Sequence, residues 1–252
     1  IPPSVFTGTT RYRRAVLYVS KDTITGAQVR EDLYAAPQRV GVIKGVSDSI
    51  LAETISTYAE QIMTSIRDME IEEAQQRFLR SLSKDSVLTD KFGIALRLPS
   101  VYKVGKQEEN FIWIDREIQK GSMNLIAYQM PGDYFDNDSS LVASIIRMRD
   151  SIGKLYIPGP DVPNKTTYMG TEKAFAPAVF PTEINGIEAI EVRGIWEVIN
   201  YPMAGPFLTY ILKDKERQRN IVLEGFTFAP ATNKRDYMFE LEAIIRTATV
   251  KE

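Results

Sequence analysis

Three residues near the C-terminus have the types and spacing to bind an anion. Asn233, Lys234 and Arg235 open a helix predicted over about residues 234–248, with Asn233 as its N-cap. Two cations beside the free N–H groups of a helix N-terminus would make a site for a phosphate or a carboxylate. Alternatively, both side chains point into solvent or pair with strand carboxylates such as Glu224. We therefore treat Asn233, Lys234 and Arg235 as candidate anion-binding residues.

Four carboxylates on predicted strands could carry out acid–base chemistry: Asp115, Glu117, Glu197 and Glu224. Nothing in their spacing pairs two of them at the roughly 5–9 Å that a glycosidase needs. Alternating charged residues on strands usually form the solvent face of an antiparallel sheet. Trp113 and Trp196 could line a sugar-binding surface, although a strand tryptophan beside isoleucine is more often part of the core. The sequence therefore assigns no catalytic residue.

The amino-acid composition excludes several other kinds of catalytic and metal site. The 252 residues include neither His nor Cys, which excludes Ser-His-Asp and Cys-His catalysis, disulfides, and zinc sites built on imidazole or thiolate. With 31 Lys and Arg against 33 Asp and Glu, the net charge is −2, so the basic excess of a nucleic-acid-binding protein is missing. The basic run Arg11–Arg14 is interpreted as a solvent-exposed approach to the first strand. We expect no cofactor, no metal ligand and no nucleic-acid partner.

An acidic cluster precedes a second predicted helix. Asp133, Asp136 and Asp138 carry oxygen ligands of the kind that Ca²⁺ prefers. An EF-hand loop needs Gly and Glu at two later positions, but this sequence has Leu141 and Arg147 there. The cluster is therefore interpreted as a turn followed by a helix N-cap, where Asp and Ser satisfy free backbone N–H groups.

The first 90 residues predict strands and helices. We expect a buried strand at 15–19, a short helix at 26–35 that Pro37 ends, and a strand at 40–43. A long amphipathic helix follows at about 48–82, with a bend or a break near residue 71 where the apolar stripe changes phase. This helix is expected to pack on a sheet, although self-association through it is an alternative.

Two β-β-β-α units follow, an order that predicts an α+β protein with antiparallel sheets and helices packed on one face. The predicted strands are 91–99, 110–118 and 122–131, then 188–199, 205–214 and 219–230, and the predicted helices are 139–153 and 234–248. We divide the chain into an N-terminal segment (1–90), a first unit (91–157), a Pro-rich connector (158–187) and a second unit (188–252). Residues 91–252 are expected to form one compact domain, either alone or together with 1–90. A short strand is expected in the connector near 166–169.

Several phrases of the sequence resemble one family. They are the opening Ile-Pro-Pro-Ser-Val-Phe, residues 92–99 and 110–114, Gly194-Ile-Trp196, residues 204–207, and the segments 224–230, 234–237 and 241–243. This pattern is similar to the Bacteroidota predicted-lipoprotein family catalogued as domain of unknown function 4837. The resemblance implies a longer precursor with a lipoprotein signal, a lipidated Cys and a strand–helix segment upstream. Because the family has no assigned activity, the resemblance assigns no catalytic residue.

The resemblance implies a non-catalytic lipoprotein module on the periplasmic side of a cell-envelope membrane, which binds a partner or ligand or is structural. Its partner would be an envelope protein or glycan, and it would touch the membrane only through the lipid anchor. The alternative is a carboxylate-dependent enzyme acting on glycans or another envelope polymer. A cleft that brings strand carboxylates together beside exposed aromatic residues would favour the enzyme.

Overall fold

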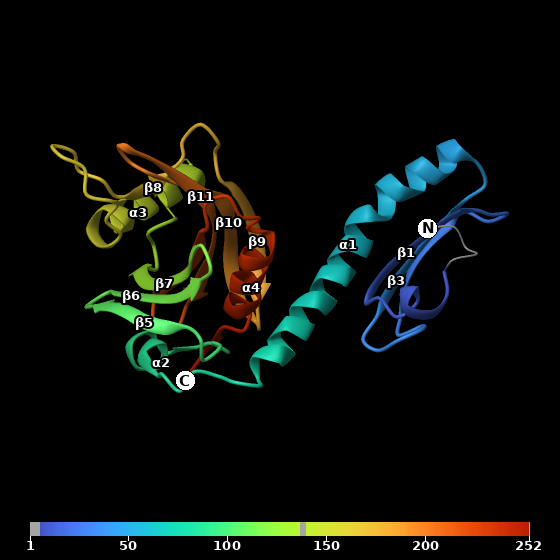
Figure 1. Ribbon diagram of the computed structural model, residues 1–252, viewed down its shortest axis with the longest axis horizontal. Helices are drawn as coiled ribbons and strands as arrows, with labels where there is room; N and C mark the ends of the chain where they lie inside the picture. The colour runs from blue at the N-terminus through green and yellow to red at the C-terminus, as the bar shows by residue number, and fades with distance from the viewer. Residues whose placement is uncertain (1–5, 137–139, 252) are drawn as a thin grey trace. The chain divides into compact units, whose positions relative to one another are not determined.

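The computed structural model describes residues 6–136 and 140–251 and divides the chain into two compact units (Figure 1). Unit 1 is Ile1–Ala74 and unit 2 is Gln75–Glu252. Each unit has its own sheet. No helix in the described part of the chain has both the length and the apolar character that crossing a lipid bilayer requires.

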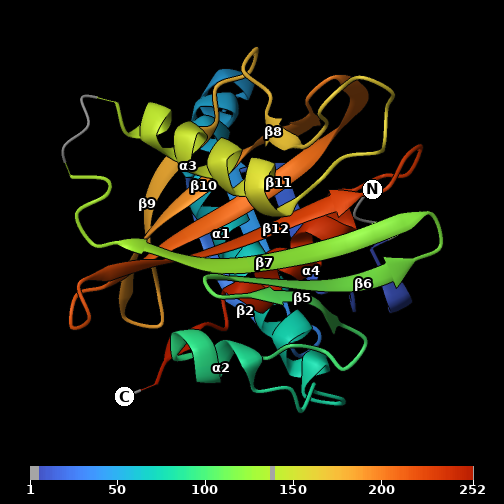
Figure 2. The same ribbon diagram turned by 90° about the vertical axis from the view of Figure 1, so that its left-hand side faces the viewer.

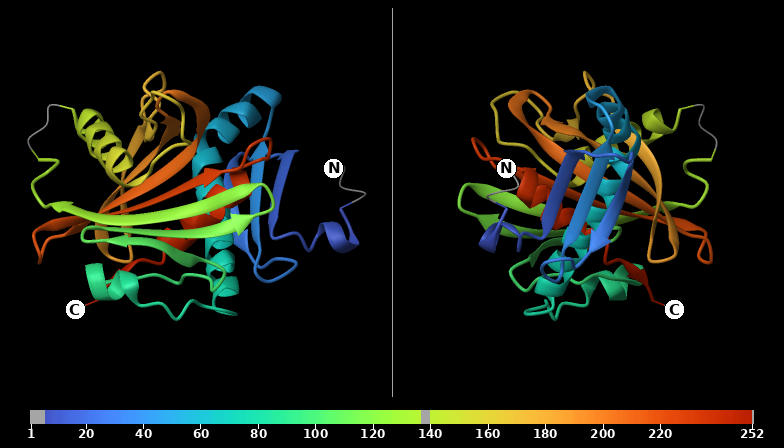
Figure 3. Two further views of the ribbon diagram at one scale, coloured as in Figure 1. Left: turned by 60° about the vertical axis from the view of Figure 1, so that its left-hand side comes forward. Right: turned by 90° about the vertical axis from the view of Figure 1, so that its right-hand side faces the viewer.

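Unit 1 is a three-stranded sheet with a helix on one face. Its strands are β1 (Ala15–Lys21), β2 (Gly26–Glu31) and β3 (Arg39–Gly45), in the order β1-β3-β2. β1 runs parallel to β3 and β2 runs antiparallel to it. The right-hand view of Figure 3 shows the three strands side by side with helix α1 (Asp48–Phe78) behind them. A one-turn 3₁₀ helix, η2 (Gly8–Thr10), precedes β1.

Three expectations for this region need correction. Residues 26–31 are β2 and not a helix, because pairing with β3 overrides the local spacing of Val29 and Leu33. The strand at 15–19 is present but is not buried, since Leu17 is 57% exposed. Helix α1 has no break near residue 71, since it continues from Asp48 to Phe78, and it ends four residues before the predicted end at 82.

Helix α1 packs on the sheet where a glycine leaves room for it. A Cβ atom at Gly41 would lie 2.7 Å from Cγ2 of Ile62, closer than two carbons can approach. Ile62 is only 3% exposed. Packing on a sheet, as expected for the amphipathic helix, is therefore confirmed within unit 1.

Unit 2 is built around one large, curled sheet, which Figure 2 shows face-on. Its strands follow the order β5-β6-β7-β12-β11-β10-β8, and β9 also pairs with β10. The strands are β5 (Lys103–Glu108), β6 (Phe111–Ile118), β7 (Gly121–Pro131), β8 (Met169–Thr171), β9 (Ala178–Ile184), β10 (Ile187–Val198), β11 (Tyr201–Asp214) and β12 (Arg219–Phe228). The helices are α2 (Val87–Phe92), α3 (Leu141–Tyr156) and α4 (Arg235–Ile245), and a two-stranded sheet joins β4 (Ile94–Ala95) to β13 (Thr249–Val250). The α+β class with antiparallel sheets and packed helices is confirmed.

The helices of unit 2 cover both faces of this sheet, whereas one face was expected. Leu241, Ile244 and Ile245 of α4 belong to one buried cluster, which also includes residues of α2. Ile145 and Met148 of α3 belong to a second cluster that contains the opposite side of the same strands. The left-hand view of Figure 3 shows α3 and α4 separated by the strands. Two cores thus share one sheet.

The first β-β-β-α unit differs from the expectation in its first strand. The stretch predicted as a strand from Lys91 to Pro99 contains the end of α2 and the two-residue strand β4. The first strand in the large sheet is instead β5, which pairs with β6. In the second unit, β10, β11, β12 and α4 lie close to the predicted positions. The strand expected near 166–169 is found as β8.

A buried ion pair joins α3 to the sheet. Nε and Nη2 of Arg149 donate to the two carboxylate oxygens of Glu224 on β12, at 2.8 and 2.7 Å. Both side chains are 1% exposed. The hydroxyl of Thr209 also donates to Glu224, at 2.7 Å, and the Arg149 guanidinium lies 3.4 Å from the ring centroid of Phe207. Since each charge is buried, each depends on the other for its solvation.

We predict that removing one partner of this pair destabilises unit 2 strongly. Glu224→Gln leaves the buried Arg149 cation without its counter-charge and should cost about 3–5 kcal/mol in urea unfolding. Arg149→Met together with Glu224→Gln should cost less than either single change, because no unpaired charge remains. Asp236→Asn is the matched control, since the Arg235–Asp236 pair is more than 80% exposed. A Glu224→Gln protein as stable as the control would contradict this prediction.

Candidate functional site

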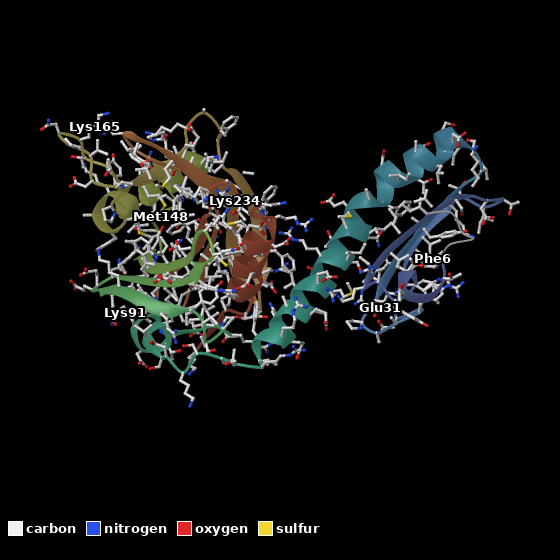
Figure 4. All side chains as sticks on the ribbon, in the orientation of Figure 1. Phe6, Glu31, Lys91, Met148, Lys165 and Lys234 are labelled. Atoms are coloured by element: carbon white, nitrogen blue, oxygen red, sulfur yellow. The ribbon has the colours of Figure 1, made fainter. Side chains whose placement is uncertain are left out.

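The three candidate anion-binding residues adjoin the start of α4, whose N-cap residue is Lys234 and not Asn233 as predicted. Figure 4 labels Lys234 at this helix. The side-chain oxygen of Asn233 accepts a hydrogen bond from the backbone N–H of Arg235, at 3.1 Å. Nζ of Lys234 donates to the carbonyl of Thr232, at 3.0 Å, and Nε of Arg235 donates to Asp236, at 2.9 Å. Both cations therefore have partners within the chain, and the anion site stays a prediction.

The four candidate carboxylates are not brought into one cleft. Asp115 and Glu117 lie on β6, and burial and the charge of Glu117 raise the pKa of Asp115. Glu197 lies on β10, which three strands separate from β6 in the sheet order. Burial, and then the charges of Glu172 and Asp150, raise the pKa of Glu197. Glu224 is held in the ion pair with Arg149.

The two tryptophans and the acidic turn have structural roles. Trp196 is 3% exposed in the core beneath α3, and Trp113 packs against that core. The interpretation of both as core residues is confirmed. Ser140 caps α3, because its hydroxyl accepts from the N–H of Ala143 at 3.3 Å. Asp138 lies outside the described residues.

The open edge of β1 presents backbone groups that no strand in the described ranges satisfies. The carbonyl of Arg14 accepts from the N–H of Arg39 at 2.8 Å, and the N–H of Asp22 donates to the carbonyl of Gly45 at 3.0 Å. Both residues therefore direct their backbone toward β3. Because backbone direction alternates along a strand, the odd-numbered residues of β1 direct their N–H and C=O groups outward. They are Ala15, Leu17, Val19 and Lys21.

A shallow groove of about 450 Å³ runs along this edge. It is lined by Phe6, Thr10, Arg13 and the strand residues from Ala15 to Ser20. The strand contributes exposed apolar side chains: Leu17 is 57% exposed and Tyr18 and Val19 are each 41% exposed. Unpaired backbone groups beside apolar side chains are what an added strand needs. We call the β1 edge and this groove the edge groove.

A buried glutamine fixes the chain that enters the edge groove. Nε2 of Gln38, which is fully buried, donates to the carbonyls of Arg11 and Arg13 at 2.6 and 2.7 Å. Its side-chain oxygen accepts from the N–H of Tyr34 at 2.9 Å. Its backbone N–H donates to the carboxylate of Asp32 at 2.8 Å. The basic run is thus held in place by its backbone carbonyls.

The three arginines of this run differ in their partners. Arg11 donates to the carbonyl of Phe6 at 2.7 Å and lies over the Phe6 and Tyr34 rings, at 5.8 and 5.6 Å. Arg14 donates to both carboxylate oxygens of Glu70 on α1, at 2.9 and 2.8 Å, and this hydrogen-bonded pair raises the pKa of Arg14. Arg13 lines the edge groove and has no side-chain partner among residues 6–136 and 140–251.

The edges of the large sheet are protected, in contrast to β1. Strand β9 has Pro181 in its middle, and β8 is only three residues long. Strand β5 carries Lys103 and Lys106 and has a register shift between Val104 and Lys106. Proline, lysine, short strands and bulges are the devices that keep strand edges from pairing with other chains. Strand β1 has none of them before its last residue, Lys21.

Sequence reasoning missed the edge groove although it identified both of its parts. Residues 15–19 were predicted as a strand, but their apolar character suggested burial. The basic run Arg11–Arg14 was interpreted as a solvent-exposed approach. A basic run directly before an unprotected apolar strand is the signal that could have identified the groove.

The fold is that of an α+β protein whose curled antiparallel sheet carries helices on both faces. Residues 81–247 match the family described as Domain of unknown function (DUF4837), and the chain belongs to this family. Residues 1–79 match a second description, Domain of unknown function (DUF8532). No curated protein matches the chain.

Solved structures similar to this chain are distant. A Bacteroides thetaiotaomicron protein shares 12% identity, with a TM-score of 0.34, over 64% of this chain and 46% of that one. The chain thus spans less than half of that protein. A Pseudomonas aeruginosa protein of unknown function, described as a putative regulator, shares 10% identity over 59% of this chain and 88% of that one, with a TM-score of 0.34. The Saccharomyces cerevisiae Ran-binding protein Mog1p shares 9% identity over 63% and 90%, with a TM-score of 0.33. These similarities contribute nothing to the assignment of function.

We predict that Gln38→Leu loosens the entrance to β1. The change leaves the carbonyls of Arg11 and Arg13 without their donor and the N–H of Tyr34 without its acceptor, which should cost unit 1 about 2–4 kcal/mol. Amide hydrogen exchange in residues 11–21 should become faster. Gln28→Leu on β2 is the control, because Gln28 is exposed and makes none of these bonds. Equal exchange in both variants would contradict this role of Gln38.

The predicted anion site can be tested with inorganic phosphate. If Asn233, Lys234 and Arg235 bind the anion, the backbone amide resonances of 234–236 should shift saturably during a phosphate titration. Lys234→Gln with Arg235→Gln should abolish the shift, whereas Lys165→Gln, an exposed change elsewhere, should preserve it. Shifts that increase without saturation would mean that no site exists there.

Proposed function

We propose that this protein is a non-catalytic module of the cell envelope that binds a protein partner by strand addition at the edge groove. The observation that carries the proposal is the row of outward-facing backbone groups at Ala15, Leu17 and Val19, flanked by exposed apolar side chains. Main-chain hydrogen bonds supply affinity in this mode of recognition, and alternate side chains supply specificity.

The location in the envelope is a separate part of the proposal. The resemblance to predicted lipoproteins supports a lipid anchor in the full-length form and a position on the periplasmic side of a membrane. The partner is then an envelope protein. Two observations support binding over carboxylate-dependent catalysis: Glu224 is already paired with Arg149, and Glu197 lies on a strand that three other strands separate from Asp115 and Glu117.

We predict that Val19→Pro abolishes partner binding while unit 1 stays folded. Proline removes only a backbone N–H that faces the open edge, so the bonds between β1 and β3 are kept. Partner recovered from detergent-solubilised envelope fractions by the full-length protein should decrease about tenfold or more, measured by quantitative mass spectrometry.

Val29→Pro is the matched control for this experiment. The N–H of Asp32 donates to the carbonyl of Gln38 at 3.0 Å, so the N–H of Val29 faces the open edge of β2 instead. The same substitution then blocks the opposite edge of the same sheet. Equal loss with both prolines, or no loss with Val19→Pro, would refute binding at the β1 edge.

A further inference from the structure

We propose that the strand added at the edge groove is an extended acidic peptide that runs antiparallel to β1, with carboxylates near its C-terminal end against Arg13. This inference rests on the proposed function and names its partner's chemistry. Arg13 precedes the first residue of β1, so an antiparallel peptide reaches it with its C-terminal end. Antiparallel pairing is also the slightly more stable arrangement per residue.

The segment that lines the edge groove is basic. Residues 6–20 include Arg11, Arg13 and Arg14 and no Asp or Glu. The carboxylates of unit 1 lie elsewhere, mostly on α1, where Glu70 pairs with Arg14. The cations that remain beside the groove attract an acidic segment rather than a basic one.

Arg13 is the cation that a carboxylate at the groove would meet. Arg11 is engaged by Phe6 and Tyr34, and Arg14 is engaged by Glu70. A carboxylate that paired with either would first have to displace an existing contact. Arg13 lines the groove and has no partner in the described part of the chain, so its pairing with a peptide carboxylate displaces nothing.

The remaining groove surface determines the rest of the peptide. Leu17 and Val19 direct their side chains to one face of the sheet, and Val16 and Tyr18 direct theirs to the other. Cross-strand pairs of β-branched and aromatic residues stabilise such an edge. The preferred peptide therefore has β-branched residues along its length and acidic residues at its end.

A second copy of the chain fits the same edge less well. If two β1 strands paired antiparallel about Leu17, Arg13 of each copy would lie opposite Lys21 of the other. Lys21 is a cation already paired with Asp48, so Arg13 would gain no carboxylate there. A shift by one register step on each strand would place Arg14 opposite Asp22. Those two residues are already paired with Glu70 and Lys44. Charge thus favours a peptide over self-pairing.

Two synthetic peptides test the inference on the 252-residue chain. Both are acetylated, labelled and made of alternating threonine and valine; one ends in two aspartates and the other in two lysines. Fluorescence anisotropy gives their dissociation constants with the unmodified chain, Arg13→Gln, Val19→Pro and Val29→Pro. We expect the unmodified chain to bind the acidic peptide at least tenfold more tightly than the basic one. Arg13→Gln should weaken binding of the acidic peptide about tenfold. Val19→Pro should abolish binding of this peptide, and Val29→Pro should preserve it.

The other outcomes separate the inference from the proposed function. One such outcome is that both peptides bind equally, with binding lost in Val19→Pro and unchanged in Arg13→Gln. This result overturns the inference that the partner is acidic but supports strand addition. Failure of both peptides to bind overturns both. Slow hydrogen exchange at Leu17 and Val19 before any peptide is added also overturns both, because the edge is then already covered. If the edge is already covered, a doubled solution mass would show that a second copy of the chain covers it. An unchanged mass would show that another part of the same polypeptide covers it.

Discussion

The pairing of β7 with β12 is the interaction on which unit 2 depends. It joins the third strands of the two β-β-β-α units in the middle of the sheet, from Ser122 opposite Phe228 to Pro131 opposite Arg219. Since side chains alternate along both strands, this register decides which residues face α3 and which face α4. A shift by one residue would move Glu224 away from Arg149 and into the apolar core under α4. The buried ion pair and the two cores are consequences of this one register.

The same pairing shows that the repeated order of elements is not a repeat in space. In the sheet order β5-β6-β7-β12-β11-β10, the strands of the first unit run from its first to its third, and those of the second unit run from its third to its first. The two sets of strands are therefore related by a rotation about an axis normal to the sheet. Such a rotation keeps every helix on the face where it started. Helices α3 and α4 lie on opposite faces. The two units therefore share a sequence of elements but differ in the path that each helix takes from its last strand.

The sequence predicted most of unit 2 because its central strands are apolar and regular. Strands β10, β11 and β12 were predicted within a few residues, and so was α4. Strands β5 and β9 were missed because both are edge strands: Gly105 and the neighbouring lysines break the apolar pattern of β5, and Pro181 resembles the irregular connector around it. The edge groove was missed for the converse reason. Which strand lies at an edge depends on pairing between distant segments, and β1 has the composition of a central strand.

The position of Arg13, which has no side-chain partner in the described part of the chain, supports the proposal that binding takes place in unit 1. In unit 2 the central arginines are engaged: Arg219 donates to Asp214, Gln129 and the carbonyl of Phe92, and Arg116 donates to Glu240. A ligand anion at either one would have to replace a contact that holds strands or helices together, so its binding would oppose folding. The edge of β1 is different, because its backbone groups and Arg13 gain partners and lose none. Binding energy at the edge groove is therefore available without cost to the structure that presents it, as a docking surface requires.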